Sequence, residues 1–308
     1  MTRWAEADVP NQAGRVAVVT GANSGLGFHV TRVLAAAGAH VILGCRDAQR
    51  ATNAMKRILD VVPDARLELR VLDLADLDSV ATFCDAVGAE HDRVDLLVNN
   101  AGIMAVPTRH TTAQDHELQF GTNHLGHFAL TACLGPLLRD RQGARVVTVT
   151  SFLHRLGKID FDDIDAERGY SRWRAYGASK LANLLFAFEL DRRLRAAGHA
   201  AISVAAHPGY AATELASTGP GLDGRGLRVA AMEASEHIVA QSAARGALPL
   251  LYATTAPGVA GGDFYGPRIL ESWGAPTKAR PTRRARDAQA AARLWKLSTQ
   301  LTGVSVDL

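Results

Sequence analysis

A tyrosine and a lysine lie four residues apart in the stretch Tyr176-Gly177-Ala178-Ser179-Lys180. The residues that follow are typical of a helix, so this spacing places the phenol and the ammonium on one helix face, one turn apart. A tyrosine hydroxyl has an ordinary pKa of about 10, and a nearby cation favours the phenolate. The same spacing often arises by chance. The pair predicts an acid–base group only if the rest of the chain builds a site around it.

The elements that would position this pair are predicted as strands alternating with helices. Short β-branched runs without polar alternation are typical of strands buried on both faces of a sheet. The run at 15–20 has this pattern, and further strands are predicted at 40–45, 67–72, 94–98, 145–150 and 201–206. Helices are predicted from the end of the first turn to Gly38, then at about 47–61, 76–87, 113–139 and 176–198. Each crossover is long enough for a right-handed βαβ unit, which predicts a doubly wound α/β fold.

A glycine-rich turn joins the first predicted strand to the first helix. Its sequence is Gly21-Ala22-Asn23-Ser24-Gly25-Leu26-Gly27. Glycines in this context let the backbone approach a pyrophosphate at a helix N-terminus. Their spacing is G-x-x-x-G-x-G rather than the commoner G-x-G-x-x-G, and glycine-rich turns also occur for steric reasons alone. The turn indicates a nucleotide site without establishing one.

Other polar residues follow the predicted strands directly. Ligands of open α/β sheets bind beyond the carboxyl ends of the strands, so residues in these positions share one rim. They are the turn at 21–27, Arg46, Asp73, Asn99 to Gly102, Ser151 and His207 to Gly209. Several weak signals therefore converge on one site.

The composition of the chain narrows its class. With 308 residues, 47% of them hydrophobic, it can bury a sizeable core. The net charge of +3 gives no basis for a nucleic-acid surface, and we expect the basic run at 278–286 to be a solvated loop. Three widely spaced cysteines suggest free thiols. We expect no signal peptide, no membrane anchor and a cytoplasmic location.

Taken together, these motifs resemble the short-chain dehydrogenase/reductase superfamily across about 14–270. The matching residues, in the family's order, are Thr20, Gly21, Gly25, Gly27, Asp73, Leu74, Asn99 to Gly102, Asn123, Ser151, Tyr176, Lys180, Pro208, Gly209 and Thr213. Details resemble the branch of retinol-dehydrogenase-like and WW-domain-oxidoreductase-like proteins. These details are Gly44-Cys45-Arg46-Asp47, Ser151-Phe152-Leu153-His154 and Ser179-Lys180-Leu181-Ala182-Asn183.

The resemblance implies one Rossmann-type domain over residues 1–308. We expect a mostly parallel seven-stranded sheet with helices on both faces, a substrate lid at about 210–236 and a C-terminal helix at about 285–302. Related proteins commonly pair through long helices such as 113–139 and 176–198, which implies a homodimer or homotetramer.

The resemblance also implies catalytic roles. Tyr176 would donate a proton to a carbonyl oxygen during reduction and remove it during alcohol oxidation. Ser151 would polarise that oxygen, although Thr150 beside it is a competing hydroxyl. Lys180 would bind the nicotinamide ribose and lower the pKa of Tyr176. Asn123 would hold a water that links the lysine to solvent, although it could simply be a residue in a kinked helix.

The end of the second strand bears on the choice of cofactor. An acidic residue there would bind the ribose hydroxyls of NAD, but this chain has Cys45 followed by Arg46, which could pair with a 2′-phosphate. Asp47 is the one contrary charge. We therefore expect NADP(H) in preference to NAD(H). The expected cofactor contacts are Gly21, Asn23, Ser24, Gly25, Leu26, Gly27, Arg46, Asp73, Leu74, Asn100, Ala101, Gly102, Tyr176, Lys180, Pro208, Gly209 and Thr213.

The substrate side is less readable from the sequence. Leu153, Tyr210 and Leu215 suggest an apolar pocket, with His154 near the substrate. We expect no metal site, since the histidines at 124, 127 and 154 have no credible ligand geometry. The leading hypothesis is an NADP-dependent carbonyl reductase or alcohol dehydrogenase that acts on an apolar small molecule. Reduction of an activated C=C bond and a catalytically silent NADP-binding regulator or scaffold are the alternatives.

Overall fold

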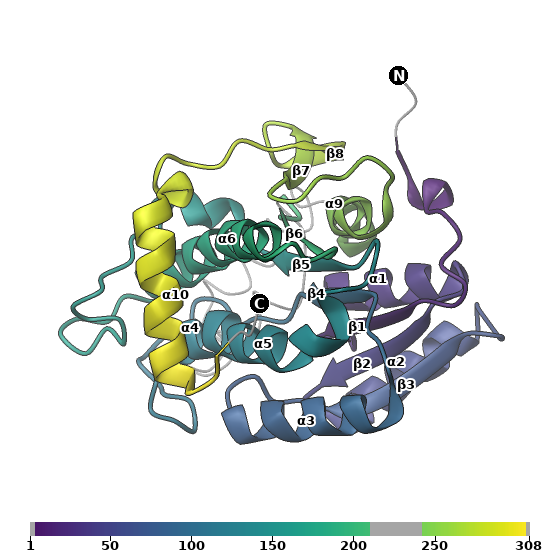
Figure 1. The fold of residues 1–308 in the computed structure, drawn as a ribbon, viewed down its shortest axis with the longest axis horizontal. Coiled ribbons are helices and arrows are strands. Elements are labelled where there is room, and N and C mark those ends of the chain that lie inside the picture. The colour runs from purple at the N-terminus through teal and green to yellow at the C-terminus, as the bar shows by residue number, and fades with distance from the viewer. Residues whose placement is uncertain (1–3, 210–241, 306–308) are drawn as a thin grey trace, which may run out of the picture.

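Parallel strands form the centre of the fold. The computed structural model describes residues 4–209 and 242–305, and in them eight strands form one sheet in the order β3-β2-β1-β4-β5-β6-β7-β8 (Figure 1). All neighbouring pairs are parallel except β7 and β8, which are antiparallel. The strands are β1 (Val16–Thr20), β2 (His40–Cys45), β3 (Arg66–Val71), β4 (Leu96–Asn99), β5 (Arg145–Val149), β6 (Ile202–Ala206), β7 (Phe264–Ile269) and β8 (Trp273–Lys278). The doubly wound, mostly parallel fold is confirmed, with eight strands instead of seven.

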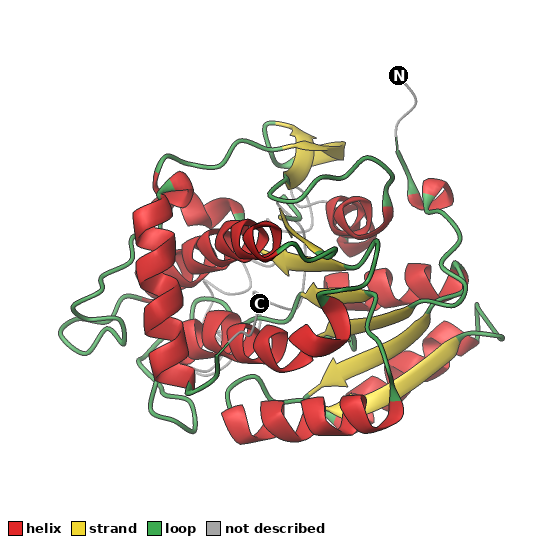
Figure 2. Cartoon of the chain, in the orientation of Figure 1, coloured by secondary structure: helices red, strands yellow, loops and turns green. Residues whose placement is uncertain are grey.

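The two faces of the sheet are covered by different helices (Figure 2). Alternate residues of β1 point to opposite faces, so Val16 and Val18 join one core cluster while Ala17 and Val19 join another. The first cluster contains side chains of α3 (Leu77–Glu90), α5 (Gly126–Leu138), α6 (Arg172–Ala197) and α10 (Ala288–Thr302). The second contains side chains of α1 (Gly25–Ala36), α2 (Ala48–Leu59) and α9 (Ala243–Thr255).

The prediction of a helix over 113–139 is wrong about where the helix begins. Helical structure begins with α4 (Leu118–Phe120), continues as a π-helical turn, η2 (Gly121–Leu125), and becomes regular in α5. Glu117 ends the preceding turn, because its carboxylate accepts from the backbone N–H groups of Gln119 and Phe120. The kink considered around Asn123 is therefore a π turn, the form that commonly marks functional positions in helices.

The C-terminal helix, α10, occupies the stretch where one was expected. Trp295 packs against Phe128 of α5 and Phe186 of α6, with ring centroids 5.2 Å and 5.8 Å away. The Ser298 hydroxyl lies 2.8 Å from Nε2 of His124 in the π turn. These contacts hold α10 against α5, α6 and the π-helical turn that carries Asn123.

Two sequence-based expectations fall on other parts of the chain. The basic run at 278–286 is not only a solvated loop, because Lys278 ends β8 and pairs with Asp263 at 2.8 Å, and Arg284–Arg286 form a short 3₁₀ turn. The expected lid at 210–236, with Tyr210, Thr213 and Leu215, lies outside the described residues.

None of the helices that the structure describes is both long and apolar enough to cross a bilayer.

Candidate active site

The glycine-rich turn closes tightly against the loop after β4. A Cβ added to Gly27 would lie 2.3 Å from the Gly21 carbonyl oxygen and 2.6 Å from the Asn100 amide nitrogen, so only glycine fits. The Asn100 amide donates to the Thr20 carbonyl at 2.8 Å. These contacts hold the backbone of the glycine-rich turn in one conformation.

The helix that follows the turn begins with free backbone donors. Ser24 is the N-cap of α1, yet its side chain makes no capping hydrogen bond. The first N–H groups of a helix have no partner within the helix and attract anions. Asn23, Gly25 and Leu26 border the same turn. The arrangement can therefore hold a phosphate group at the carboxyl edge of β1.

Cys45 lies at the end of β2, directly beneath the turn. Its sulfur is hydrogen-bonded to the backbone at Ala22 and Asn23, and burial raises the pKa of the thiol to about 11. An uncharged group thus occupies the place where an acidic residue would repel a 2′-phosphate. The contrary charge at Asp47 is already engaged, because its carboxylate accepts from the Arg50 backbone N–H at 2.9 Å as the N-cap of α2.

A cavity beside the turn contains residues that sequence reasoning missed. Its volume is about 300 Å³, and its wall includes Asn23 and Ser24 together with Arg50 and Arg57 of α2. The Arg57 guanidinium lies 4.3 Å from the Phe28 ring centroid, and Arg46 is exposed at the end of the neighbouring strand. Two helix arginines therefore add to the positive charge around the turn. In the sequence, the spacing of these two arginines along α2 is that of an ordinary solvated helix face. It therefore gave no sign that they belong to the cofactor site.

The tyrosine identified from the sequence lies in the second turn of α6 and is 3% exposed. Its hydroxyl is hydrogen-bonded to the side chain of Ser151. Ser151 follows β5 and caps the 3₁₀ turn η3 (Phe152–Leu156). This segment packs directly on α6, because a Cβ added to Gly157 would lie 2.3 Å from the Gly177 carbonyl oxygen. The close packing brings the two hydroxyls together.

Thr150, the competing hydroxyl, has a different partner. Its Oγ1 donates to the Lys180 carbonyl oxygen at 2.7 Å, and the residue is 2% exposed. It therefore fastens the end of β5 to α6. The hydroxyl that meets Tyr176 is that of Ser151.

Lys180 is buried one turn beyond Tyr176. Its ammonium nitrogen lies 5.8 Å from the tyrosine ring centroid and donates to the Val149 carbonyl oxygen at 3.3 Å. Burial lowers the pKa of Lys180 to about 8. Burial also raises the pKa of Tyr176 to about 12, against the lowering effect of the Ser151 hydrogen bond. Desolvation is the larger of these two effects, so the pKa of Tyr176 is raised where the sequence predicted that it would be lowered.

Asn123 lies in the π turn and is fully buried. Its side chain accepts from the Ile103 backbone N–H at 2.8 Å and donates to the Ile103 carbonyl at 3.0 Å and to Ser179 Oγ at 2.9 Å. A Cβ on Gly102 would lie 3.0 Å from Asn123 Oδ1 and 3.3 Å from Lys180 Nζ. Asn123 therefore ties the loop after β4 to the face of α6 that carries Lys180.

The remaining predicted cofactor residues lie around the same rim. Asp73 follows β3, its backbone N–H bonds to the Ser79 hydroxyl at 3.0 Å, and its carboxylate accepts from Ala75 N. Leu74 is buried. Pro208 and Gly209 follow β6, and Gly209 has a φ of +73°. Thr213 lies outside the described part of the chain.

Of the predicted substrate residues, Leu153 and His154 lie in η3, next to Ser151. His154 is buried, and its Nδ1 donates to the Ser151 carbonyl at 2.7 Å. Its ring meets Phe264 edge to face with centroids 5.7 Å apart. His154 therefore stabilises the backbone at Ser151, whereas Leu153 is partly exposed.

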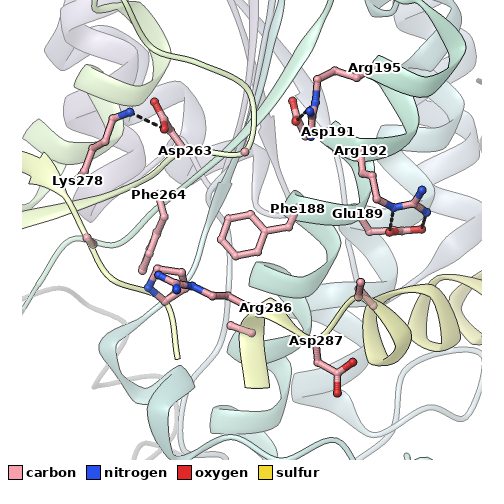
Figure 3. A pocket seen from close by; sticks show the side chains of 16 residues that line it. Phe188, Glu189, Asp191, Arg192, Arg195, Asp263, Phe264, Lys278, Arg286 and Asp287 are labelled. Carbon is pink, nitrogen blue, oxygen red and sulfur yellow. Dashed lines mark hydrogen bonds and ion pairs between the residues drawn. The ribbon is translucent and has the colours of Figure 1, made fainter. Parts of the chain in front are cut away.

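A larger cavity of about 430 Å³ lies away from this site (Figure 3). Its wall comes from the second half of α6, the start of β7 and the segment that leads into α10. Its carboxylates are engaged: Glu189 pairs with Arg192, Asp191 with Arg195, Asp263 with Lys278, and Asp287 caps α10. The described carboxylates that line this cavity are therefore committed to ion pairs or to a helix cap.

Comparisons with known proteins match this geometry. A family model described as short chain dehydrogenase matches residues 15–219. Human retinol dehydrogenase 12 is 36% identical over 293 residues, which cover 94% of this chain and 87% of that protein. The crystal structure of an uncharacterized protein from Mycobacterium paratuberculosis has a TM-score of 0.83 and 43% identity and covers 100% of both chains. A short chain dehydrogenase from Burkholderia cenocepacia J2315 in complex with NADP has a TM-score of 0.64, 23% identity and coverage of 82% and 96%, which shows a shared fold.

Proposed function

The chain belongs to the short-chain dehydrogenase family, in its retinol-dehydrogenase-like branch, and is a nicotinamide-dependent oxidoreductase acting on CH–OH donors; from this we propose that it transfers a hydride between NADP(H) and the carbonyl or alcohol carbon of an apolar small molecule. Tyr176 is the acid and base of this reaction. The observation that carries the proposal is the hydrogen bond between the hydroxyls of Tyr176 and Ser151, one helical turn from Lys180.

The residues present fit a dinucleotide. The uncapped N-terminus of α1 and the turn fixed by Gly27 suit a pyrophosphate. Asp73 and Leu74 would lie along the adenine, Asn100 to Gly102 along the adenosine ribose, and Lys180 at the nicotinamide ribose. Pro208 and Gly209 would flank the nicotinamide. The bound cofactor supplies or accepts the hydride.

The proton chemistry falls to the protein. Tyr176 donates its hydroxyl proton to the developing oxyanion during reduction, and Ser151 holds the same oxygen in place. In the oxidative direction the phenolate accepts the proton from the alcohol. Asn123 keeps the loop after β4 against Lys180, which positions the ammonium. The route by which Lys180 recovers a proton runs through a water held at the π turn.

The raised pKa of Tyr176 suits the reductive direction. A phenol with a pKa of about 12 holds its proton at neutral pH and is ready to donate it. Oxidation requires the phenolate, which the positive charge of an oxidised nicotinamide would favour. Lys180 and the oxidised nicotinamide would act together on the phenol, as the sequence predicted.

A preference for NADP(H) over NAD(H) is supported by three features around β2. Cys45 is uncharged, Asp47 is committed to capping α2, and Arg46 is exposed with Arg50 and Arg57 beside the turn. Guanidinium groups bind phosphates in a bidentate manner. The NADP complex of the Burkholderia neighbour agrees with this at the level of the fold.

The proposed substrate is an apolar carbonyl compound or alcohol. The Leu153 backbone N–H donates to Ser151 Oγ at 3.2 Å, and a relative that covers 94% of the chain is named a retinol dehydrogenase. We also propose that the chain forms one domain, that residues 210–236 act as a lid, that the protein pairs with itself, and that it works in a reducing, cytoplasmic environment. The described cysteines, all free thiols, are consistent with the last point.

A screen of NADPH consumption tests this proposal. Purified protein is mixed with NADPH and a panel of ketones, aldehydes including retinal, steroids and quinones, alongside Tyr176→Phe. The proposal predicts turnover of a carbonyl compound that the variant loses. Reduction only of activated C=C bonds would favour the first alternative. NADPH binding without turnover on any compound would favour the silent regulator and contradict the proposal.

A further inference from the structure

Three side chains from separate elements converge at the end of the sheet opposite to Tyr176. His40 is the first residue of β2, Glu68 lies in β3, and His91 is the C-cap of α3. The Nε2 atoms of His40 and His91 lie 3.4 Å and 2.9 Å from the same carboxylate oxygen, Glu68 Oε2. One ligand atom from each residue lies within 4.8 Å of the other two.

The fold itself brings these residues together. In the parallel pairing of β2 and β3, Ile42 lies opposite Glu68, and His40 is two residues before Ile42 on the same face. Ile42 shares its core cluster with Phe83 of α3, so α3 covers this face. Figure 1 shows α3 alongside β3. His91, at the C-terminal end of α3, reaches the other two side chains, and its ring centroid is 5.2 Å from that of His40.

We propose that His40, Glu68 and His91 form a zinc-binding site. Two imidazoles and one carboxylate are a donor set that proteins use for Zn²⁺, with a fourth position left to water. Zinc–ligand bonds of about 2.0–2.2 Å in a tetrahedron place the ligand atoms roughly 3.4 Å apart. The two nitrogen–oxygen separations, 3.4 Å and 2.9 Å, are already close to this spacing.

The surroundings leave the donors available. The side chains of His40, Glu68 and His91 are 29%, 20% and 12% exposed, so an ion can reach them from solvent.

The charge of Arg70, a cation that contacts Glu68, is itself balanced by a second carboxylate. Arg70 contacts the other oxygen of Glu68, Oε1, and also pairs with Glu90 at 2.5 Å. Its charge is shared between two carboxylates, and its contact orients Glu68 so that Oε2 faces the two histidines. Such outer contacts commonly fix the ligands of a metal site.

The position of the site indicates its role. Active-site residues follow the carboxyl ends of the strands, whereas His40 begins its strand. A zinc ion here would join the edge strand β3, its neighbour β2 and the end of α3. We infer a structural clip that stabilises this end of the sheet and leaves the reaction at Tyr176 unchanged.

Calorimetric titration of chelator-treated full-length protein with ZnCl₂ tests the site. We expect one equivalent of Zn²⁺ to bind and raise the melting temperature, and MgCl₂ to do neither, because Mg²⁺ prefers oxygen ligands. His40→Gln and His91→Gln should each lower the Zn²⁺ affinity at least about 10-fold. Far-UV circular dichroism shows which variants are folded, and one folded variant is sufficient for the test.

Matched controls separate this site from adventitious binding. His110→Gln, at an exposed histidine, and Cys133→Ser should bind Zn²⁺ as the parent does. Co²⁺ should give the visible absorption of a tetrahedral nitrogen and oxygen site without a thiolate band. The proposal is overturned if no Zn²⁺ binds, or if a folded histidine variant keeps the Zn²⁺ affinity of the parent; the cluster is then only a hydrogen-bonded ion pair.

Discussion

Thr20 and His127 are joined by a hydrogen bond of 2.8 Å between Oγ1 and Nε2, across 107 residues of sequence. The same Thr20 oxygen accepts from the backbone N–H groups of Asn100 and Ala101, each at 2.9 Å. On the other side of the ring, His127 Nδ1 lies 3.0 Å from the Asn123 carbonyl oxygen. One buried imidazole therefore links the phosphate turn, the loop after β4 and the π turn.

The partners fix the tautomer of this histidine. A carbonyl oxygen only accepts, so the ring hydrogen is on Nδ1, and Nε2 accepts from the Thr20 hydroxyl. Burial lowers the pKa of His127 to about 4, which keeps the ring neutral as this pattern requires. We call this group of contacts, Thr20 with His127, Asn100, Ala101 and Asn123, the threonine latch.

Thr20→Val should destabilise the protein through this latch. The change keeps the shape of the side chain but removes the partner of the Ala101 backbone N–H and of the His127 ring nitrogen, while the Asn100 N–H keeps its contact with the Val98 carbonyl oxygen. We expect the free energy of unfolding to fall by about 2–4 kcal/mol, measured by urea denaturation. Thr148→Val is the matched control, since the buried Thr148 hydroxyl has no partner among the described residues. Equal losses in the two variants would contradict the role of the latch.

Arg46→Ala should weaken NADPH binding much more than NADH binding. Loss of a charge-assisted hydrogen bond to the 2′-phosphate corresponds to a rise of about tenfold or more in the dissociation constant of NADPH. Fluorescence titration with both cofactors measures this, and NADH serves as the internal control. A similar loss for both cofactors would remove the proposed phosphate contact.

Acid should destabilise the fold through its buried histidines. Burial lowers the pKa values of His124, His127 and His207 to about 3, 4 and 4, while an unfolded histidine titrates near 6.5. Between these values the unfolded state binds more protons, so stability is lost as the pH falls below about 6.5. Each such histidine contributes a slope of about 1.4 kcal/mol per pH unit.

His124→Asn isolates one of these contributions. The free energy of unfolding of this variant should depend less steeply on pH between about 6.5 and 4.5 than that of the parent protein. His110→Gln, at an exposed position, should keep the parent slope. An unchanged slope in the His124 variant would show that this histidine is protonated in the fold.

The two reaction directions should differ in their response to pH. Because the pKa of Tyr176 is raised to about 12, alcohol oxidation should accelerate as the pH rises above neutrality, when more phenolate forms. Carbonyl reduction needs the protonated phenol and should be nearly constant between pH 6 and about 7.5, below the pKa of about 8 of Lys180. Initial rates in both directions across this range check the prediction. Oxidation that slows with rising pH would contradict it.

The sequence predicted the parallel part of the fold because its signals are local. Among β1 to β6, all strands except the alternating β3 are largely apolar runs, and several site residues follow these strands directly. Strands β7 and β8 carry Gly266 with Pro267 and Gly274 with Pro276, residues that are depleted in strands, so they were missed. The start of the helix at Leu118 depends on Glu117, whose carboxylate forms the N-cap.

Contacts between residues that are far apart in the chain could not be predicted from the sequence. The neutral Cys45 was recognised because a single position decides it, whereas Arg50 and Arg57 approach the turn only through the packing of α2. The role of His127 in the threonine latch has no signal in the sequence, since its partner Thr20 is far away in the chain. The cluster of His40, Glu68 and His91 has no motif spacing either. The raised pKa of Tyr176 follows from burial that only the fold produces.

The central claim is that Tyr176 moves the proton, and Tyr176→Phe tests it most directly. The variant is compared with the parent protein for NADPH binding and for turnover of a carbonyl substrate that the parent reduces. We expect the dissociation constant of NADPH to change by less than about threefold and kcat to fall by at least about 100-fold, the contribution of a positioned proton donor. A variant that binds NADPH and turns over the substrate at nearly the parent rate would contradict the account.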